Sequence, residues 1–217
     1  LNVVVDLKPD HCSIWTGTQA QTMDRAMAAQ AAMLNPGQVE IHTTFLGGGF
    51  GRRANPRSDF VVEAVQVAMA VRQPVKVVWT REDDMRGGNY RPMWSDYIEA
   101  GIAKNGKPLV WKHTIVGQSI VADTSFEAFL TKGGIDATSV EGAANLPYVI
   151  PNLQVELHSP KNTVPVQWWR SVGHSHTAFV VETMIDELAT MAGKDPIAYR
   201  LGNLPATSRY IAVLQLA

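Results

Sequence analysis

The sequence predicts an α+β fold in which mixed β-sheets carry packed helices. Three observations lead to this class. Short strand-like and helix-like segments alternate over residues 1–92. Two longer strand-like segments then follow, joined by a hairpin turn. The clearest amphipathic helical pattern comes only after them. We therefore expect a first β-α-β-loop-α-β subdomain over residues 1–92, and a long-strand hairpin with helices over residues 93–217.

Composition excludes several classes of protein. The 217 residues hold 19 basic and 20 acidic side chains, a net charge of −1, which argues against a nucleic-acid-binding protein. No apolar run approaches the roughly 20 residues that cross a bilayer, so we expect no membrane span. The single cysteine, Cys12, excludes an intrachain disulfide and a cysteine-based zinc site.

The first subdomain is expected to begin inside a strand. A helix should follow Thr18, which we expect to cap it, and Asn35-Pro36-Gly37 should end it. The predicted strands are Asn2–Val5, Cys12–Thr16, Val39–Phe45 and Val75–Thr80, and the predicted helices are 19–34 and 57–71. Glu82-Asp83-Asp84 is expected to form a solvated turn or a helix cap.

The second subdomain starts with strands 97–103 and 109–120 around an Asn105-Gly106 turn. A strand over 149–158 and a helix over 175–192, capped by Ser175, are expected next. Asp195-Pro196 should start a further helix, because Asp is a favourable N-cap residue and Pro is favoured at the first helical position. Both chain ends lie within strand-like or helix-like segments, so we expect the sequence to continue in a longer chain.

Residues 47–53 (Gly-Gly-Gly-Phe-Gly-Arg-Arg) lie between a predicted strand and a helix. Four glycines in five positions cost entropy, which favours close approach of the backbone to a ligand with N–H groups pointing at an anion. A tight turn packed on a neighbouring strand is the alternative. The run is neither a Walker A loop nor a dinucleotide fingerprint, which needs glycine where Arg52 stands.

A second candidate site precedes the long helix, where Arg170 and Gly173 stand at its expected start. They could form another anion site, and the alternative is a capped helix with Trp168 and Trp169 in the core. His174 and His176 lack a third ligand nearby, so no metal site is predicted.

Taken in order, these motifs resemble the molybdenum-binding large subunit of the xanthine dehydrogenase/aldehyde oxidase family. Gln19, the Gly-Gly-Gly-Phe-Gly run, Arg81-Glu82-Asp83-Asp84 and residues 170–173 (Arg-Ser-Val-Gly) occur in the family's succession. Arg52-Arg53 and Arg-Ser-Val-Gly are similar to the branch of isoquinoline oxidoreductase beta subunits, often called membrane-bound aldehyde dehydrogenase.

The resemblance implies a molybdopterin, in this branch the cytosine dinucleotide form, and oxidation of aldehydes or N-heterocycles with water as oxygen source. Arg170 would stabilise charge at the reacting centre. The implied cofactor-binding residues are Gln19, Gly48, Gly49, Phe50, Gly51, Arg52, Ser171 and Gly173. Partners would be an iron–sulfur small subunit, a cytochrome c and a small-molecule substrate, at the periplasmic side or periphery of a bacterial inner membrane.

The family's general base is a glutamate in a Gly-rich stretch, and Glu141-Gly142 lacks that setting. We therefore expect this chain alone to be inactive and to hold no cofactor. Two other functions stay open: a non-catalytic, cofactor-free domain, and a nucleotide-binding α+β domain that uses the Gly loop with Arg52 and Arg53.

Overall fold

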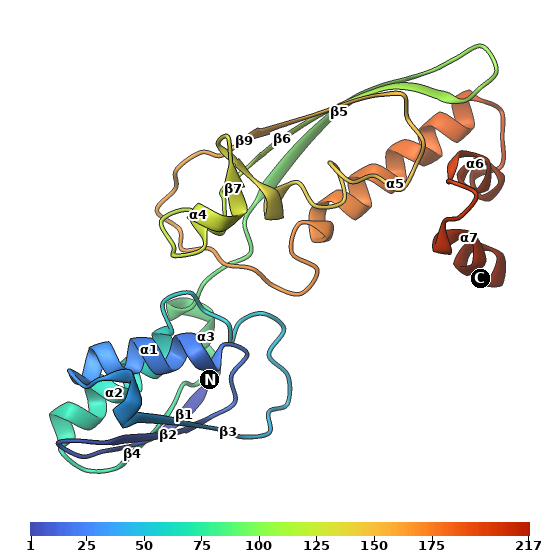
Figure 1. Cartoon of the computed structure of the whole chain (residues 1–217). Helices are drawn as coiled ribbons and strands as arrows, with labels where there is room; N and C mark the ends of the chain where they lie inside the picture. The colour runs from blue at the N-terminus through green and yellow to red at the C-terminus, as the bar shows by residue number, and fades with distance from the viewer. The chain divides into compact units, whose positions relative to one another are not determined.

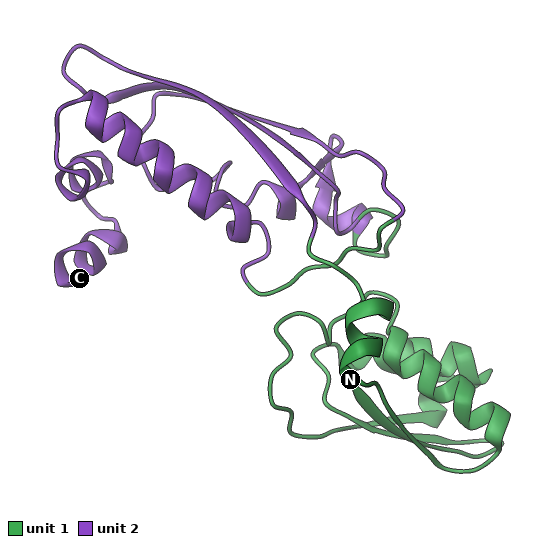
Figure 2. Ribbon diagram, turned by 180° about the vertical axis from the view of Figure 1, so that it is seen from behind, with its two compact units in different colours: residues 1–91, 122–126, 164–170 green, residues 92–121, 127–163, 171–217 purple.

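The computed structural model describes residues 1–217, which form two compact units (Figure 2). Unit 1 comprises Leu1–Arg91, Ala122–Phe126 and Val164–Arg170. Unit 2 comprises Pro92–Val121, Glu127–Thr163 and Ser171–Ala217. Two short segments of the later sequence thus belong to the first unit. No helix combines the length and apolar character needed to cross a membrane.

Unit 1 is built on a mixed four-stranded sheet of order β3-β2-β1-β4. Its strands are β1 (Asn2–Leu7), β2 (Cys12–Thr16), β3 (Val39–Thr43) and β4 (Val75–Val78). Strands β2 and β3 are parallel, and the other pairs are antiparallel. Helices α1 (Gln21–Ala32) and α2 (Asp59–Val71) cover one face of the sheet (Figure 1). Val5, Ile14 and Phe60 lie in the core between these layers.

Unit 2 holds the predicted hairpin, β5 (Trp94–Ile102) and β6 (Pro108–Gly117), with β9 (Asn152–His158) parallel to β6. The long helix α5 (His174–Met191) packs along this sheet (Figure 1). Trp111, Ile185 and Tyr199 form the centre of its core. The remaining elements of the chain are α3 (Arg81–Gly87), α4 (Glu127–Leu130), β7 (Thr131–Lys132), β8 (Ile135–Asp136), α6 (Pro196–Asn203), α7 (Arg209–Leu216) and the 3₁₀ turns Pro36–Gln38 and Ala137–Ser139. Mixed sheets with packed helices confirm the predicted α+β class.

The helix caps agree with the sequence at some ends and differ at others. Asp195 caps α6, as the sequence predicts. Thr80, expected at the end of a strand, instead caps α3, and Asp83 completes a capping box. The expected Thr18 cap is wrong, because α1 begins after Ala20 and the Thr18 hydroxyl donates to the buried Asp24 carboxylate.

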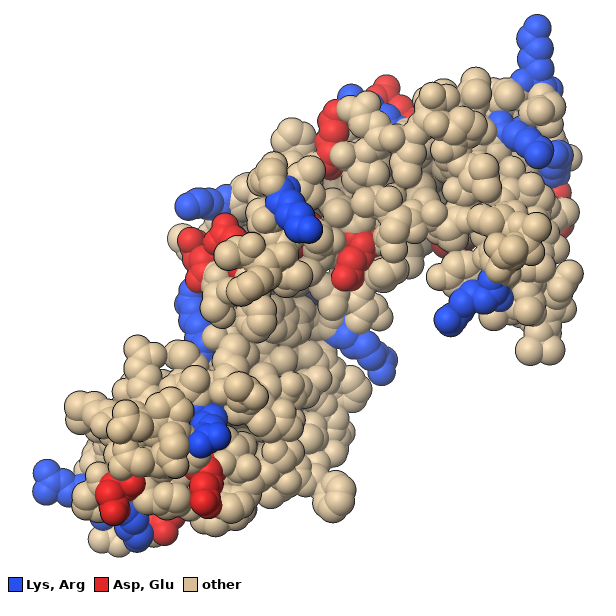
Figure 3. All heavy atoms as spheres, viewed as in Figure 1, with Lys and Arg blue, Asp and Glu red and all other residues tan.

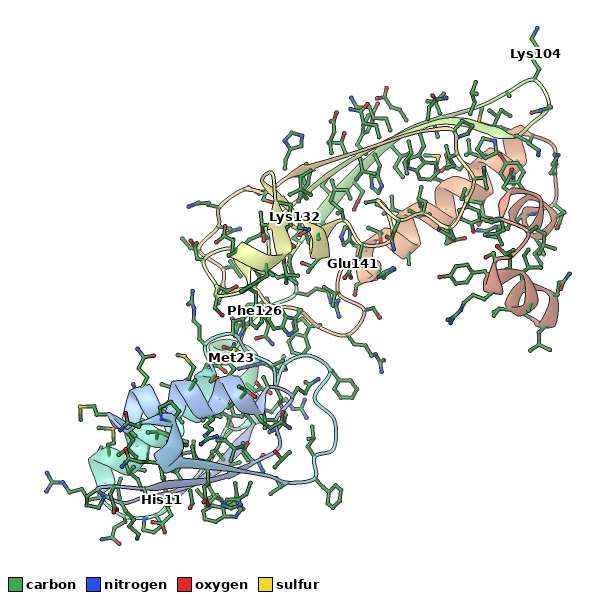
Figure 4. All side chains as sticks on the ribbon, viewed as in Figure 1. His11, Met23, Lys104, Phe126, Lys132 and Glu141 are labelled. Atoms are coloured by element: carbon green, nitrogen blue, oxygen red, sulfur yellow. The ribbon has the colours of Figure 1, made fainter.

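Ser175 is also not a cap. Helix α5 starts one residue earlier, with Gly173 at the N-cap position. The carboxylate of Glu141 accepts a hydrogen bond from the Gly173 N–H at 3.2 Å and lies 3.5 Å from the His174 ring. Glu141 is labelled in Figure 4. A carboxylate 32 residues away in sequence therefore contacts the start of the helix, where no local side chain caps it.

A buried polar cluster lies under helix α5 in unit 2. The His113 Nε2–H donates to one carboxylate oxygen of Asp96 at 2.8 Å, and the His176 ring lies 3.4 Å from the other Asp96 oxygen. Burial alone would raise the pKa of Asp96, but the hydrogen bonds and charges of the two histidines outweigh it and hold that pKa at about 2. The His176 ring also stacks on Trp94 with centroids 4.2 Å apart.

Charged side chains are mixed in sign on the face shown in Figure 3, without a broad basic area. This distribution agrees with the balanced composition of 19 basic and 20 acidic residues.

Candidate functional site

The Gly-rich run forms an exposed loop between β3 and α2 in unit 1. The backbone N–H groups of Gly48, Gly49 and Phe50 have no hydrogen-bond acceptor in this chain. The Gly51 N–H instead donates to the Gln19 side-chain oxygen at 3.1 Å. That bond leaves the Gln19 NH₂ group as its outward donor. The loop thus presents consecutive donors to the space outside the protein.

Each glycine that the loop needs has its own physical reason. Gly48 and Gly51 have φ angles of +128° and +98°, which residues other than glycine rarely adopt. A Cβ on Gly49 would collide with the Gln19 side chain, 2.6 Å from its Cδ, whereas Gly47 faces open space. Backbone conformation and close packing inside the protein therefore explain why some of these positions require glycine, whether or not a ligand approaches the loop.

Arg170 lies against the loop, although 120 residues of sequence separate it from Phe50 (170 − 50). Its N–H donates to the Phe50 carbonyl at 2.8 Å, and its guanidinium lies 5.4 Å from the centre of the Phe50 ring. Both side chains are exposed. The structure thus brings together Gln19, the glycine loop and Arg170, all within unit 1.

The other two residues expected in the site belong to unit 2. Ser171 follows Arg170 directly with a φ of +74°, and Val172 has a φ of +41°. Two consecutive non-glycine residues in the left-handed region are uncommon and cost energy. Gly173 is buried at the start of α5, where its N–H is already bonded to Glu141.

Arg52 and Arg53 point into the protein. The Arg52 guanidinium is buried and makes two hydrogen bonds to Asp59, of 3.0 and 2.8 Å, while its N–H donates to the Gly49 carbonyl. Arg53 donates to the Gly17 carbonyl at 2.7 Å, and burial lowers its pKa. Arg52 therefore shapes the loop, and its geometry does not support the expected direct contact with a cofactor.

Sequence reasoning missed a buried amide pair beneath this site. Asn55 donates from Nδ2 to the Gln167 side-chain oxygen at 2.9 Å, and both side chains are buried. Trp168, next along the chain, meets Phe126 edge-on with ring centroids 5.4 Å apart; Phe126 is labelled in Figure 4. No local pattern marks a contact between residues 112 positions apart.

The donor set indicates what kind of group fits here. Backbone N–H groups, the Gln19 amide and the Arg170 guanidinium are all donors or cations, which match an oxygen-rich or anionic ligand. No group of three His, Cys, Asp or Glu side chains could hold a metal ion in either unit. The chain's own residues therefore fit a cofactor bound through its oxygens, rather than a metal ligated directly by protein.

The molybdopterin cofactor-binding domain family matches residues 2–204, so this chain belongs to that family. Among curated relatives, the beta subunit of isoquinoline 1-oxidoreductase from Brevundimonas diminuta is 29% identical over 202 residues, covering 93% of this chain and 26% of that protein. The molybdenum-binding subunit of aldehyde oxidoreductase from Escherichia coli K12 is 28% identical over 192 residues, covering 88% of this chain and 24% of that protein.

Solved structures show the same fold. Quinoline 2-oxidoreductase from Pseudomonas putida 86 superposes with a TM-score of 0.81 at 20% identity, over 99% of this chain and 29% of that chain. Aldehyde oxidoreductase from Desulfovibrio gigas gives a TM-score of 0.75 at 21% identity, over 95% of this chain and 22% of that chain. The chain spans about a quarter of these proteins. The family predicted from the sequence is confirmed.

Proposed function

We propose that this chain supplies part of the cofactor-holding site of a molybdenum hydroxylase that oxidises aldehydes or N-heterocycles with water as oxygen source. The observation that carries the proposal is the row of unpaired N–H groups at Gly48, Gly49 and Phe50 beside the Arg170 guanidinium. Family membership supports it, because the matching family binds molybdopterin.

In this proposal the protein binds and orients, and the molybdopterin supplies the redox chemistry when it is bound. The unpaired N–H groups donate to its oxygens, and they are fixed in advance by the bonds of the loop to Gln19 and Arg170. The Gln19 NH₂ group adds a side-chain donor. Arg170 places a permanent positive charge at the edge of the site, where it stabilises a developing anion.

The finer identity of the cofactor and partners follows from the same proposal. We assign the cytosine dinucleotide form of molybdopterin, an iron–sulfur small subunit and a cytochrome c as electron acceptors, and a small-molecule substrate. The two relatives described above are named as subunits of oxidoreductases, which supports partner subunits. The cytosine dinucleotide form and the cytochrome c rest on the resemblance to the isoquinoline oxidoreductase branch. A single cysteine cannot hold an iron–sulfur cluster, which takes about four, so the cluster must lie elsewhere.

The general base is also proposed to lie outside these residues. No glutamate approaches the loop through a hydrogen bond, and Glu141 is engaged in capping α5 of unit 2. Losing a positioned base costs roughly 10² to 10⁴ in rate. We therefore propose that residues 1–217 alone neither turn over substrate nor retain the cofactor.

Metal analysis of two purified proteins tests this function: the longer subunit that we propose contains this sequence, and residues 1–217 alone. We expect stoichiometric molybdenum and oxidation of an aldehyde or an N-heterocycle only in the first. Molybdenum with turnover in residues 1–217 would contradict the proposal that the general base lies outside these residues.

The same assay separates the two alternatives. Adenylate binding without molybdenum would favour a nucleotide-binding domain, although Arg52 and Arg53 are already paired inside the fold. A longer subunit that binds neither molybdenum nor nucleotide would favour a non-catalytic domain.

A further inference from the structure

The orientation of the buried Asn55 amide is fixed by its surroundings. The Arg57 N–H can only donate, and it meets Asn55 Oδ1 at 2.8 Å. The Asn55 NH₂ must then face Gln167, so Gln167 turns its oxygen toward Asn55 at 2.9 Å. The Gln167 Nε2 group is left buried without a partner in the chain. The pair is therefore held by one directional bond whose two ends cannot be exchanged.

Gln167 also belongs to a strap, Val164–Arg170, that runs beside the rest of unit 1. Near its start the strap is joined to Tyr90 by two backbone hydrogen bonds. The Tyr90 N–H donates to the Pro165 carbonyl at 2.9 Å, and the Gln167 N–H donates to the Tyr90 carbonyl at 3.1 Å. It ends where the Arg170 N–H donates to Phe50 at 2.8 Å. Gln167 is thus the last residue of the first attachment and stands three residues before Arg170, which makes the second.

The side chain of Gln167 makes a second attachment, beside the Arg170–Phe50 bond, between the strap and the segment that carries the loop. Asn55 stands four residues after Gly51, and its side chain is 4% exposed, whereas Gln167 is fully buried. A hydrogen bond in such a place has no competition from water and is costly to break. It fixes the register of the strap against the loop.

We infer that Asn55 and Gln167 are positioning residues that set Arg170 opposite the donor row of the glycine loop. They act through the strap and touch no ligand themselves. The functional meaning of this inference rests on the proposed function, because it needs Arg170 and the loop to bind one group. The geometric part stands on the contacts in unit 1 alone.

Amide hydrogen exchange of the cofactor-free chain, resolved by NMR, tests the inference. Gln167→Met keeps a similar side-chain volume and removes the oxygen that accepts from the buried Asn55 NH₂ group. Leaving that donor without an acceptor weakens the attachment of the strap, so exchange of the Arg170 N–H should become about tenfold faster. The Val62 N–H, bonded to Ser58 within α2, should be unchanged. Gln66→Met, an exposed glutamine on α2, is the matched control.

Two further variants separate positioning from general packing. Gln167→Glu keeps an oxygen acceptor for Asn55, so in this variant the Arg170 N–H should exchange as slowly as in the wild type. Asn55→Leu should quicken it, and adding Gln167→Met should then have no further effect, because both remove one bond.

The inference fails if Gln167→Met leaves exchange of the Arg170 N–H unchanged. It also fails if exchange of the Val62 N–H becomes faster by the same factor, as it would in a variant that does not fold. It also fails if Gln167→Glu behaves like Gln167→Met. Failure of the proposed function gives a different result, namely a wild-type longer subunit without molybdenum, whatever the exchange rates show.

Discussion

Gly51 packs directly on the backbone of Trp168. A Cβ atom on Gly51 would lie 2.8 Å from the Trp168 carbonyl oxygen and 2.9 Å from the Trp169 Cα. Real Cβ atoms do not approach backbone so closely, and backbone cannot turn aside as a side chain can. The last glycine of the run is therefore needed to seat the strap that ends in Arg170, independently of any ligand.

Gly51→Ala should destabilise unit 1 by about 1–3 kcal/mol, because it combines a clash with backbone and a φ of +98°. Urea unfolding followed by tryptophan fluorescence measures this change. Gly47→Ala is the control, since Gly47 has open space around it, and it should change stability by less than about 0.5 kcal/mol. Equal effects of the two variants would contradict the packing role.

Gly49→Val should act on cofactor binding more than on folding. Its side chain would displace the flexible Gln19 side chain rather than backbone, so the free energy of unfolding should change modestly. The longer subunit with this variant should lose most of its molybdenum, measured as metal per polypeptide. Lost stability with full molybdenum would instead indicate that Gly49 serves only a tight turn.

Arg170→Lys should lower turnover of the longer subunit about 10- to 100-fold while the melting temperature stays unchanged. Lysine keeps the charge but lacks the planar guanidinium that lies over Phe50 and can bind an anion through two donors. Steady-state kinetics with a saturating artificial electron acceptor measure the effect. Arg81→Lys, an exposed arginine on α3, should have no effect. Wild-type turnover of Arg170→Lys would exclude the proposed role.

Acid should weaken unit 2 through Asp96. Its pKa is about 2 in the folded protein and 3.8 ordinarily, so folding favours the ionised form. The stabilisation, about 2 kcal/mol, is present above pH 4 and is lost as the pH falls toward 2. Urea unfolding at pH 6, 4 and 3 should show this loss.

Asp96→Asn should flatten that pH profile, because the amide cannot ionise between His113 and His176. Glu187→Gln, which removes an exposed carboxylate from α5, should leave the profile close to that of the wild type. An Asp96→Asn protein as acid-sensitive as the wild type would show that other groups control the transition.

Local sequence was sufficient for most elements of the fold. Strand β2 occupies Cys12–Thr16 as the sequence predicts, and Pro196 begins α6 behind the Asp195 cap. Such signals act within a few residues, so the printed sequence contains them completely. The Thr18 and Ser175 caps were wrong because Asp24 and Glu141, respectively, provide interactions that depend on the folded chain.

For the candidate site, the sequence by itself determined the glycine run, the identity of Arg170 and, through their order, the family. Only the tertiary structure decided that Arg52 turns inward to Asp59 and that Gly51 seats the strap. It alone joined Asn55 to Gln167 across 112 residues. The physical reason is that a buried hydrogen bond between distant residues is set by how the layers pack, and no propensity of either residue specifies its partner.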